Sequence, residues 1–422
     1  MDIFDTLLDP IFIPRVIKVR QHFERPVIED LEAEFLEKLH QRNMLDRLQP
    51  GWRVAIAVGS RGISNQPLLV KLLVQELKKR GADPFIVPAM GSHGGATAEG
   101  QKAMLIGMGF SEAYLEAPIY AAMEVVQVGE TADGLPASVD KYAHEADAIV
   151  IVNRIKPHVA FRGPYESGLM KMISIGLGKQ RGAEICHNSG FGNMAENIPA
   201  IGRVVLQNTN IVFAVGLIEN GFHETCQIEV LPADEIESQE PALLEKARSL
   251  SQRLYFDNLD VLIIDEIGKD ISGTGFDTNV VGRYHTPYAT GGPQISRIAI
   301  LDLTEKSHGN ANGLGIVDFT TRRVFDKFEF AQTYPNSLTS TVPLTVKIPM
   351  VLKHDRHAFQ AAIKTCNILN QKDVRLVRIK NTISLSEIEV SENLRTEVAN
   401  NPNLDIVGEP YALPFDDQGN LL

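Results

Sequence analysis

The chain has 422 residues, of which 44% are hydrophobic and 22% charged, as in an ordinary globular enzyme of two or three domains. The net charge of −12 argues against a nucleic-acid partner and against binding to an anionic membrane surface. No apolar run approaches the ~20 residues that span a bilayer, and the N-terminus lacks the basic start of a secretory signal. With three widely spaced cysteines, the sequence predicts a reduced, cytoplasmic protein.

Near the start of the chain the pattern predicts a strand, a helix and a second strand. WRVAIAV (52–58) is a short apolar run, typical of a strand buried on both faces. QPLLVKLLVQELKKRGA (66–82) has apolar residues at helical spacing, with proline in its first turn and glycine at its end. DPFIVPAMG (83–91) predicts the next strand, and another helix is predicted over about 97–108.

The same alternation continues along the chain. Further apolar runs predict strands at 146–153, 210–218, 259–268 and 295–304. Strands that alternate with helices predict an α/β fold with largely parallel sheets, in which functional loops gather at the carboxyl ends of the strands. Closer to the C-terminus, TVPLTVKI (341–348) predicts a strand and RHAFQAAIKTCNIL (356–369) a helix.

A polar, amphipathic helix predicted over 235–254 is the best candidate for a connector between domains. It divides the chain into an N-terminal α/β domain, residues 1–235, and a C-terminal α/β domain, residues 255–422. The active site is expected in the cleft between them. The chain can cross from one domain to the other, so these boundaries are approximate.

Arg61 follows the first predicted strand, in the loop GSRG. A guanidinium group binds a carboxylate through two parallel hydrogen bonds, which only arginine does well. The alternative is a surface arginine in a polar turn. Because Arg61 lies at the carboxyl end of a strand, the two interpretations have about equal weight.

His93 lies in the next loop, GSHGGAT (91–97). Glycines on both sides bring the backbone close to whatever the imidazole faces, and the helix that follows begins with unpaired N–H groups that attract anions. A lone histidine is more often structural. A histidine between glycines has little packing to serve, so the pattern favours a proton-transfer role near pH 7.

The segment 154–188, RIKPHVAFRGPYESGLMKMISIGLGKQRGAEICHN, strings reactive side chains through glycine. His158 follows a predicted strand, with a proline stiffening the turn. Lys171 lies in an apolar context, where burial would make its amine a nucleophile or a covalent anchor. His187 is placed to be a metal ligand. The alternative is a glycine-rich loop with scattered polar residues.

Three other motifs carry weaker signals. GLGKQRG (176–182) resembles a dinucleotide fingerprint only loosely, because its third glycine is one residue late and no clean strand precedes it. HDRH (354–357) has the composition of a metal pair, but it begins a predicted helix and is interpreted as a solvated face. GTGFD (273–277) is a glycine-rich loop after a strand that could contact a phosphate or a substrate.

Taken together, these residues resemble the nickel-pincer lactate racemase family, which comprises racemases and epimerases of α-hydroxyacids. The resemblance covers most of the chain and is strongest over 55–190. In that family an arginine follows an early strand, and two catalytic histidines lie in a glycine-bounded loop and in a Pro-His dipeptide. A lysine carries the cofactor and a last histidine binds nickel. The matching positions here are Arg61, His93, His158, Lys171 and His187.

The resemblance implies a nickel-pincer nucleotide, a pyridinium-3-thioamide-5-thiocarboxylic acid mononucleotide joined to Lys171, with His187 completing a square-planar nickel. It implies that His93 and His158 act as acid and base on opposite sides of the α-carbon while hydride moves to and from the cofactor, and that Arg61 holds the carboxylate. The implied partners are a small-molecule 2-hydroxyacid and the enzymes that make the cofactor. The oligomeric state is left open.

The chain also departs from the family pattern. The loop KDISGTGFDTN (269–279) offers no match for the glutamine and lysine that hold substrate in lactate racemases. FRGPYESG (161–168) stands where a shorter, glycine-rich link is usual, and no acid immediately precedes the arginine loop. These departures predict a divergent member whose substrate is a larger or more polar hydroxyacid, or a sugar acid, rather than lactate.

Two other functional classes remain as alternatives. An NAD(P)-linked hydroxyacid dehydrogenase would use the same histidines and arginine, but the dinucleotide fingerprint is poor. A metabolite-binding protein would use the histidines for binding only.

Overall fold

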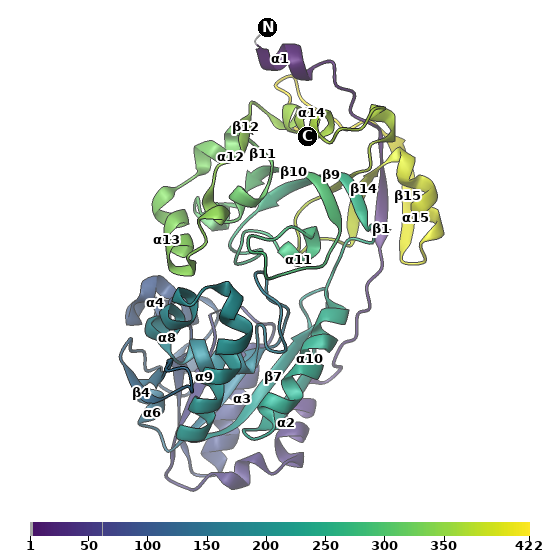
Figure 1. Cartoon of the computed structure of the whole chain (residues 1–422). Coiled ribbons are helices and arrows are strands. Elements are labelled where there is room, and N and C mark those ends of the chain that lie inside the picture. The colour runs from purple at the N-terminus through teal and green to yellow at the C-terminus, as the bar shows by residue number, and fades with distance from the viewer. Residues whose placement is uncertain (1–2, 61) are drawn as a thin grey trace. The chain divides into compact units, whose positions relative to one another are not determined.

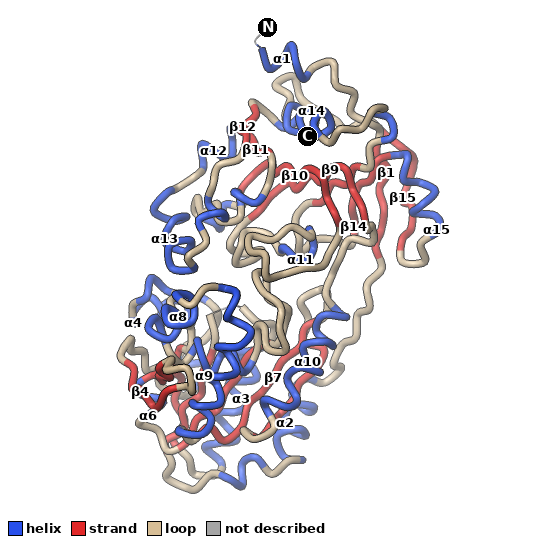
Figure 2. The backbone as a smooth tube through the Cα atoms, in the orientation of Figure 1, coloured by secondary structure: helices blue, strands red, loops and turns tan. Residues whose placement is uncertain are grey.

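The computed structural model describes residues 3–60 and 62–422, and the chain folds into two compact units (Figure 1). One unit is Glu24–Ser251. The other joins Met1–Phe23 to Gln252–Leu422. Helices and strands alternate through both units, and each contains a sheet whose strands are largely parallel (Figure 2). The predicted α/β class is therefore confirmed. None of the helices in the described part of the chain is both long and apolar enough to cross a bilayer.

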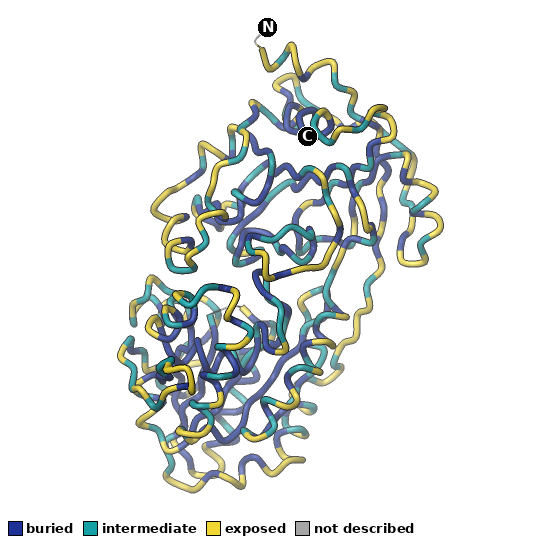
Figure 3. Tube along the Cα trace, viewed as in Figure 1, coloured by how far each residue is buried: buried dark blue, intermediate teal, exposed yellow. Residues whose placement is uncertain are grey.

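The unit Glu24–Ser251 is built on a five-stranded sheet of order β3-β2-β6-β7-β8. These strands are β2 Arg53–Val58, β3 Asp83–Pro88, β6 Ala148–Arg154, β7 Ile211–Glu219 and β8 Thr225–Pro232. The first four are parallel, and β8 pairs antiparallel with β7. The central strands are apolar runs buried on both faces, as Figure 3 shows. The loops after β2, β3 and β6 therefore leave the same edge of the sheet.

Helices and a hairpin accompany this sheet. The hairpin strands are β4 Val125–Glu130 and β5 Pro136–Asp140. The helices are α2 Leu31–Gln41, α3 Gln66–Lys79, α4 Ala98–Gly107, α5 Glu112–Leu115, α6 Lys141–His144, α7 Leu169–Lys171, α8 Lys179–Asn188, α9 Met194–Asn208 and α10 Ile236–Leu250. The predicted helix over 235–254 is α10, the last helix of this unit.

The second unit holds an eight-stranded mixed sheet of order β12-β11-β10-β9-β13-β14-β1-β15. Its strands are β1 Val16–Gln21, β9 Asn258–Ile267, β10 Gln294–Leu303, β11 Phe319–Thr321, β12 Met350–Leu352, β13 Leu376–Ile379, β14 Glu387–Ser391 and β15 Leu404–Tyr411. Its helices are α1 Ile3–Leu8, α11 Thr278–Val281, α12 Arg322–Lys327, α13 Phe330–Ser340, α14 Asp355–Thr365 and α15 Arg395–Asn400. The strands from β12 to β13 are parallel, whereas β1 lies antiparallel between β14 and β15.

The strand predicted at 341–348 is wrong. This stretch forms a short 3-10 turn, Pro343–Val346, and the strand β12 begins only at Met350. The alternating apolar residues suggested a strand, but Pro343 has no N–H to give to a sheet ladder and its fixed φ suits the first turn of a helix.

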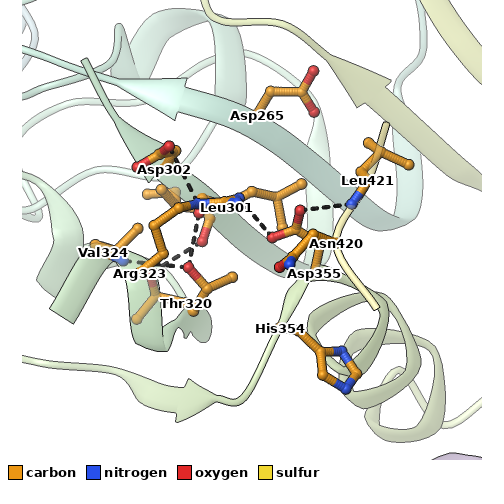
Figure 4. Close-up of polar contacts among 12 residues, drawn as sticks. Asp265, Leu301, Asp302, Thr320, Arg323, Val324, His354, Asp355, Asn420 and Leu421 are labelled. Carbon is orange, nitrogen blue, oxygen red and sulfur yellow. Dashed lines mark hydrogen bonds and ion pairs between the residues drawn. The ribbon is translucent and has the colours of Figure 1, made fainter. Parts of the chain in front are cut away.

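The interpretation of HDRH (354–357) as a solvated face is also wrong. The side chains of Asp355 and His357 are 2% and 1% exposed. Arg323 of α12 lies 2.8 Å from the Asp355 carboxylate, and the backbone N–H of Leu421 donates to its other oxygen (Figure 4). The charge of Asp355 is therefore paired with a partly exposed arginine and hydrogen-bonded by the C-terminal tail, whereas Arg356 is exposed.

The position of β1 between β14 and β15 predicts a selective effect of Ile17→Ala. Ile17 is fully buried in β1 and pairs with Val390, so its truncation should cost about 3 kcal/mol of unfolding free energy. In hydrogen-exchange measurements, β14 and β15 should lose protection while β2 and β6 keep theirs. Lys18→Ala, on the exposed face of the same strand, should leave both sheets protected. Loss of protection confined to β2 and β6 would contradict the assignment of this strand.

Candidate active site

Loops from three neighbouring parallel strands carry the residues singled out from the sequence. The loop after β2 contains Ser60, the loop after β3 contains His93, and His158 follows β6. Arg61 lies outside the described residues, so its contact with a carboxylate stays a prediction. Because β3, β2 and β6 are adjacent in the sheet, the three loops start side by side.

The ring of His93 is held by its own loop. Its Nδ1 lies 2.8 Å from the carbonyl oxygen of Met90 and 3.2 Å from the Ser60 hydroxyl. A carbonyl oxygen only accepts, so Nδ1 carries the proton and donates it. In the neutral ring the lone pair is therefore on Nε2, which makes this nitrogen a proton acceptor.

The two glycines that follow His93, Gly94 and Gly95, meet different structural constraints. Gly94 and Gly95 both have positive φ, +68° and +65°, which is the left-handed region that favours glycine. A Cβ on Gly94 would also meet the backbone N of Gln101 at 2.7 Å, whereas one on Gly95 would meet nothing within 4 Å. The close approach of the His93 loop to α4 is thus possible only with glycine at position 94.

The ring of His158 accepts a hydrogen bond at Nδ1, whereas that of His93 donates one. The backbone N–H of Ala160 donates to its Nδ1 at 3.1 Å, so in the neutral ring the proton is on Nε2. The backbone N–H of His158 itself donates to the Glu166 carboxylate at 2.6 Å. The two histidines therefore have complementary tautomers, with Nε2 an acceptor in His93 and a donor in His158.

Glu166 is the anchor of the His158 loop. Its side chain is fully buried and accepts from the backbone of His158 and Gly163. Arg248 of α10 lies 2.9 Å from its carboxylate, and Arg162 3.5 Å. Burial raises the pKa of Glu166, and these hydrogen bonds and charges oppose the rise. The stretch 161–168, through Glu166, thus holds the backbone of the His158 loop.

Lys171 and His187 approach each other across a tight helical segment. Lys171 ends α7, a π-helical turn spans Met172–Gly176, and α8 carries His187 in its last turn. Burial and, to a smaller extent, the charge of Lys171 lower the pKa of His187 to about 4. Its Nδ1 is buried and has no hydrogen-bond partner among the described residues. His187 is thus a neutral imidazole at pH 7, the form that binds metals.

Aromatic and backbone contacts bring these side chains together. The ring of Phe191 lies 5.4 Å from His187 and 6.4 Å from His158, measured between ring centroids. The backbone N–H of Gly91, in the His93 loop, donates to Gly176 at 3.2 Å, at the end of the π-helical turn. His158, Lys171 and His187 therefore share one region, and the His93 loop packs against the same segment.

Within residues 3–60 and 62–422, no group of three or more His, Cys, Asp or Glu side chains is placed to hold a metal ion. A metal bound by His187 would therefore need its other ligands from a group that is not protein. A pincer cofactor anchored at Lys171 would provide such ligands, so the residues present fit this group.

Glu240 is a site residue that the sequence analysis missed. It comes from α10, is 1% exposed, and accepts from the backbone N–H of Met170 at 2.8 Å, in the first turn of α7. A Cβ on Gly168 would lie 1.9 Å from its carboxylate. Burial raises the pKa of Glu240 to about 7. The signal was present in the sequence, because Glu240 shares the apolar stripe of its helix with Ile236 and Leu244.

These features define an α/β protein with its candidate site at the carboxyl edge of a parallel sheet. Residues 14–198 match the model of the lactate racemase N-terminal domain family. The structure of the lactate racemase apoprotein from Thermoanaerobacterium thermosaccharolyticum is similar in fold, with a TM-score of 0.51 and 14% sequence identity. The similarity covers 91% of this chain and 96% of that chain. No curated protein matches the sequence significantly. The predicted resemblance is confirmed, and it supports racemase or isomerase chemistry.

The two glycines after His93 predict unequal effects of alanine. Gly95→Ala should cost about 1 kcal/mol, the penalty of a left-handed conformation for an L-residue. Gly94→Ala has the same penalty plus the clash with Gln101, so it should lose several-fold more unfolding free energy in urea titrations. Equal losses in the two variants would contradict this packing.

The raised pKa of Glu240 predicts a pH-dependent stability. Its folded pKa of about 7 lies above the ordinary 4.5, so its contribution is fully present below pH 4.5 and is lost as the pH rises through 7. Glu240→Gln cannot ionise. In urea unfolding at pH 5 and pH 8, the advantage of the wild type over this variant should shrink at pH 8. An advantage that grows with pH would show that the carboxylate is bound as an anion.

Proposed function

We propose that this chain is an isomerase that inverts the α-carbon of a 2-hydroxyacid or a sugar acid with a covalently tethered nickel-pincer nucleotide. The observation that carries the proposal is the pair formed by Lys171 and His187. A partly buried lysine lies beside an imidazole that is neutral at pH 7 and whose buried Nδ1 has no hydrogen-bond partner in the part of the chain that the structure describes. An amine anchor and a neutral metal ligand are what the cofactor requires of the protein.

Lys171 would hold the cofactor covalently and His187 would bind its nickel. When bound, the cofactor would supply a reversible hydride acceptor for the α-carbon of the substrate. The protein contributes a dry setting for it, because the residues that follow Lys171, from Met172 to Lys179, are all buried.

His93 and His158 would exchange protons with the α-hydroxyl group. His93 Nε2, which carries the lone pair, accepts the hydroxyl proton of one stereoisomer. His158 Nε2, which carries a proton in the neutral ring, would donate a hydrogen bond to the substrate oxygen. To return a proton when the opposite stereoisomer forms, the ring would first have to become an imidazolium, because a neutral imidazole that loses its proton becomes an anion. The backbone contacts at the two Nδ1 atoms support this pairing, because in the neutral rings they leave Nε2 a proton acceptor in His93 and a hydrogen-bond donor in His158.

Arg61 would bind the substrate carboxylate through its guanidinium group. The departures from the family in 161–168 and 269–279 favour a substrate larger or more polar than lactate. Turnover would depend on the enzymes that make the cofactor, in the cytoplasm. Chiral chromatography of hydroxyacids and sugar acids incubated with cofactor-loaded protein would identify the substrate.

No structural observation favours the NAD(P)-linked dehydrogenase. GLGKQRG (176–182) runs from the π-helical turn into α8, and a Rossmann fingerprint instead connects a strand to a helix.

The cofactor assignment predicts a specific protein mass. Protein co-expressed with the cofactor-making enzymes should carry a nickel-containing adduct on Lys171, seen by intact and peptide mass spectrometry. Lys171→Ala should lack the adduct, and His187→Ala should keep the organic part but lose nickel. His93→Ala should keep both and lose turnover by about 10²–10⁴-fold. An unmodified Lys171 in the wild type would refute the proposal.

A further inference from the structure

Lys179 is a fully buried lysine to which the proposed function gives no role. Its side chain and that of its ion-pair partner Asp140 are both 0% exposed, with 3.0 Å between Nζ and Oδ2. Nζ also donates to the Gln101 side-chain oxygen at 3.1 Å and to the carbonyl oxygen of Pro88 at the end of β3. The ammonium group therefore donates two hydrogen bonds and faces a carboxylate at ion-pair distance, so its charge is paired.

This arrangement is costly for a residue that only fills space. Burying an ion pair costs desolvation on both partners, and apolar residues of similar volume often serve stability as well. Lys179 also has a φ of +54°, a left-handed conformation that a lysine adopts at a cost. A buried charge and a strained backbone at one residue point to a requirement for orientation in this part of the molecule.

The orientation passes through Gln101 of α4. A lysine ammonium only donates, so the oxygen of the Gln101 amide must face Lys179. The amide NH₂ group then faces the other way, and it donates to the carbonyl oxygens of Gly91 at 2.9 Å and His93 at 3.2 Å. Lys179 at one end and the two carbonyl oxygens at the other thus favour the same orientation of this buried amide.

Lys179 also lies in the middle of the segment 171–187, which would hold the cofactor and is called the cofactor segment below. Lys179 is the first residue of α8, the helix that carries His187, and it follows the π-helical turn that begins after Lys171. Its side chain reaches the end of β3, from which the His93 loop leaves.

We propose that Lys179 is a positioning residue that, through Gln101, fixes the His93 loop against the cofactor segment and thereby sets the tautomer of His93. The importance of this for turnover rests on the proposed function, whereas the placement of the ring does not. Without the ammonium group, the oxygen of the Gln101 amide loses its donor, which weakens the hold on the amide that donates two hydrogen bonds to the His93 loop.

The first test uses the protein without cofactor. Two-bond ¹H–¹⁵N spectra of the histidine rings, with His93 identified by its absence in His93→Gln, report the tautomer. The wild type should show a protonated Nδ1 and an unprotonated Nε2. In Lys179→Met combined with Asp140→Asn, which removes both buried charges, the two nitrogen shifts should move toward their mean. Lys141→Met, the same change at an exposed neighbour of Asp140, should match the wild type.

A second variant keeps the test decisive if the double variant does not fold. Gln101→Met leaves the ion pair of Lys179 and Asp140 in place and removes only the link to the loop, so it should shift the His93 nitrogens in the same way. If the charge-neutral double variant does not fold, Gln101→Met decides alone. Wild-type His93 shifts in every variant that folds would overturn the proposal.

The second test uses cofactor-loaded enzyme and a double-mutant cycle. Lys179→Met/Asp140→Asn should lower kcat by about 100-fold, the effect of a small misplacement of a catalytic group, with the Lys171 adduct and nickel content unchanged. In a His93→Ala background the same changes should have no further effect on kcat. Multiplicative losses in the combined variant would overturn the positioning role. Shifted His93 nitrogens in a protein without racemase turnover would instead refute the proposed function and leave the placement of His93 by Lys179 intact.

Discussion

Parallel strands deliver their carboxyl ends to one edge of a sheet, and the candidate site depends on this geometry. In the unit Glu24–Ser251, β3, β2 and β6 are neighbours, so the loops that carry His93, Ser60 and His158 begin side by side although they are distant in sequence. The segment after β6 then contributes Lys171 and His187 to the same edge. The proximity of these side chains depends on this convergence of loops.

Buried polar groups behind the loops give the site its orientation. Glu166 holds the loop of His158, Glu240 holds the first turn of α7, and Lys179 acts through Gln101 on the loop of His93. Apolar packing is non-directional, whereas hydrogen bonds distinguish donors from acceptors. Two histidines with opposite tautomers need this distinction, because their rings have nearly the same shape in either protonation state.

The sequence predicted the parts of the fold that are buried on both faces. The apolar runs at 52–58 and 210–218 match β2 and β7 to within one residue at each end, because parallel strands between helix layers leave little room for polar side chains. Half-exposed strands such as β1 and β15, in the mixed sheet, carry mixed patterns and were not predicted. Pro343 made the prediction at 341–348 wrong, because an apolar alternation does not reveal a missing N–H.

The candidate site was accessible to sequence reasoning only where a reactive side chain stands among glycines. His93, His158, Lys171 and His187 were found in this way, and the structure places the last three in one region. Their roles and that of Arg61 stay predictions. Glu166, Glu240 and Lys179 were not found, because the partners that give them meaning are distant in sequence: Arg248, Met170 and Asp140. The motif GLGKQRG was singled out from the sequence for its glycines. In the structure its unusual residue is Lys179, which is fully buried and has a positive φ.

Helix α10 contacts the site at two places, through Glu240 and Arg248. These residues are eight positions apart, a little over two helical turns along the helix. The first turn of α7, which ends at Lys171, and the loop of His158 are thus hydrogen-bonded to one helix. A substitution that displaced α10 would therefore act on both at once.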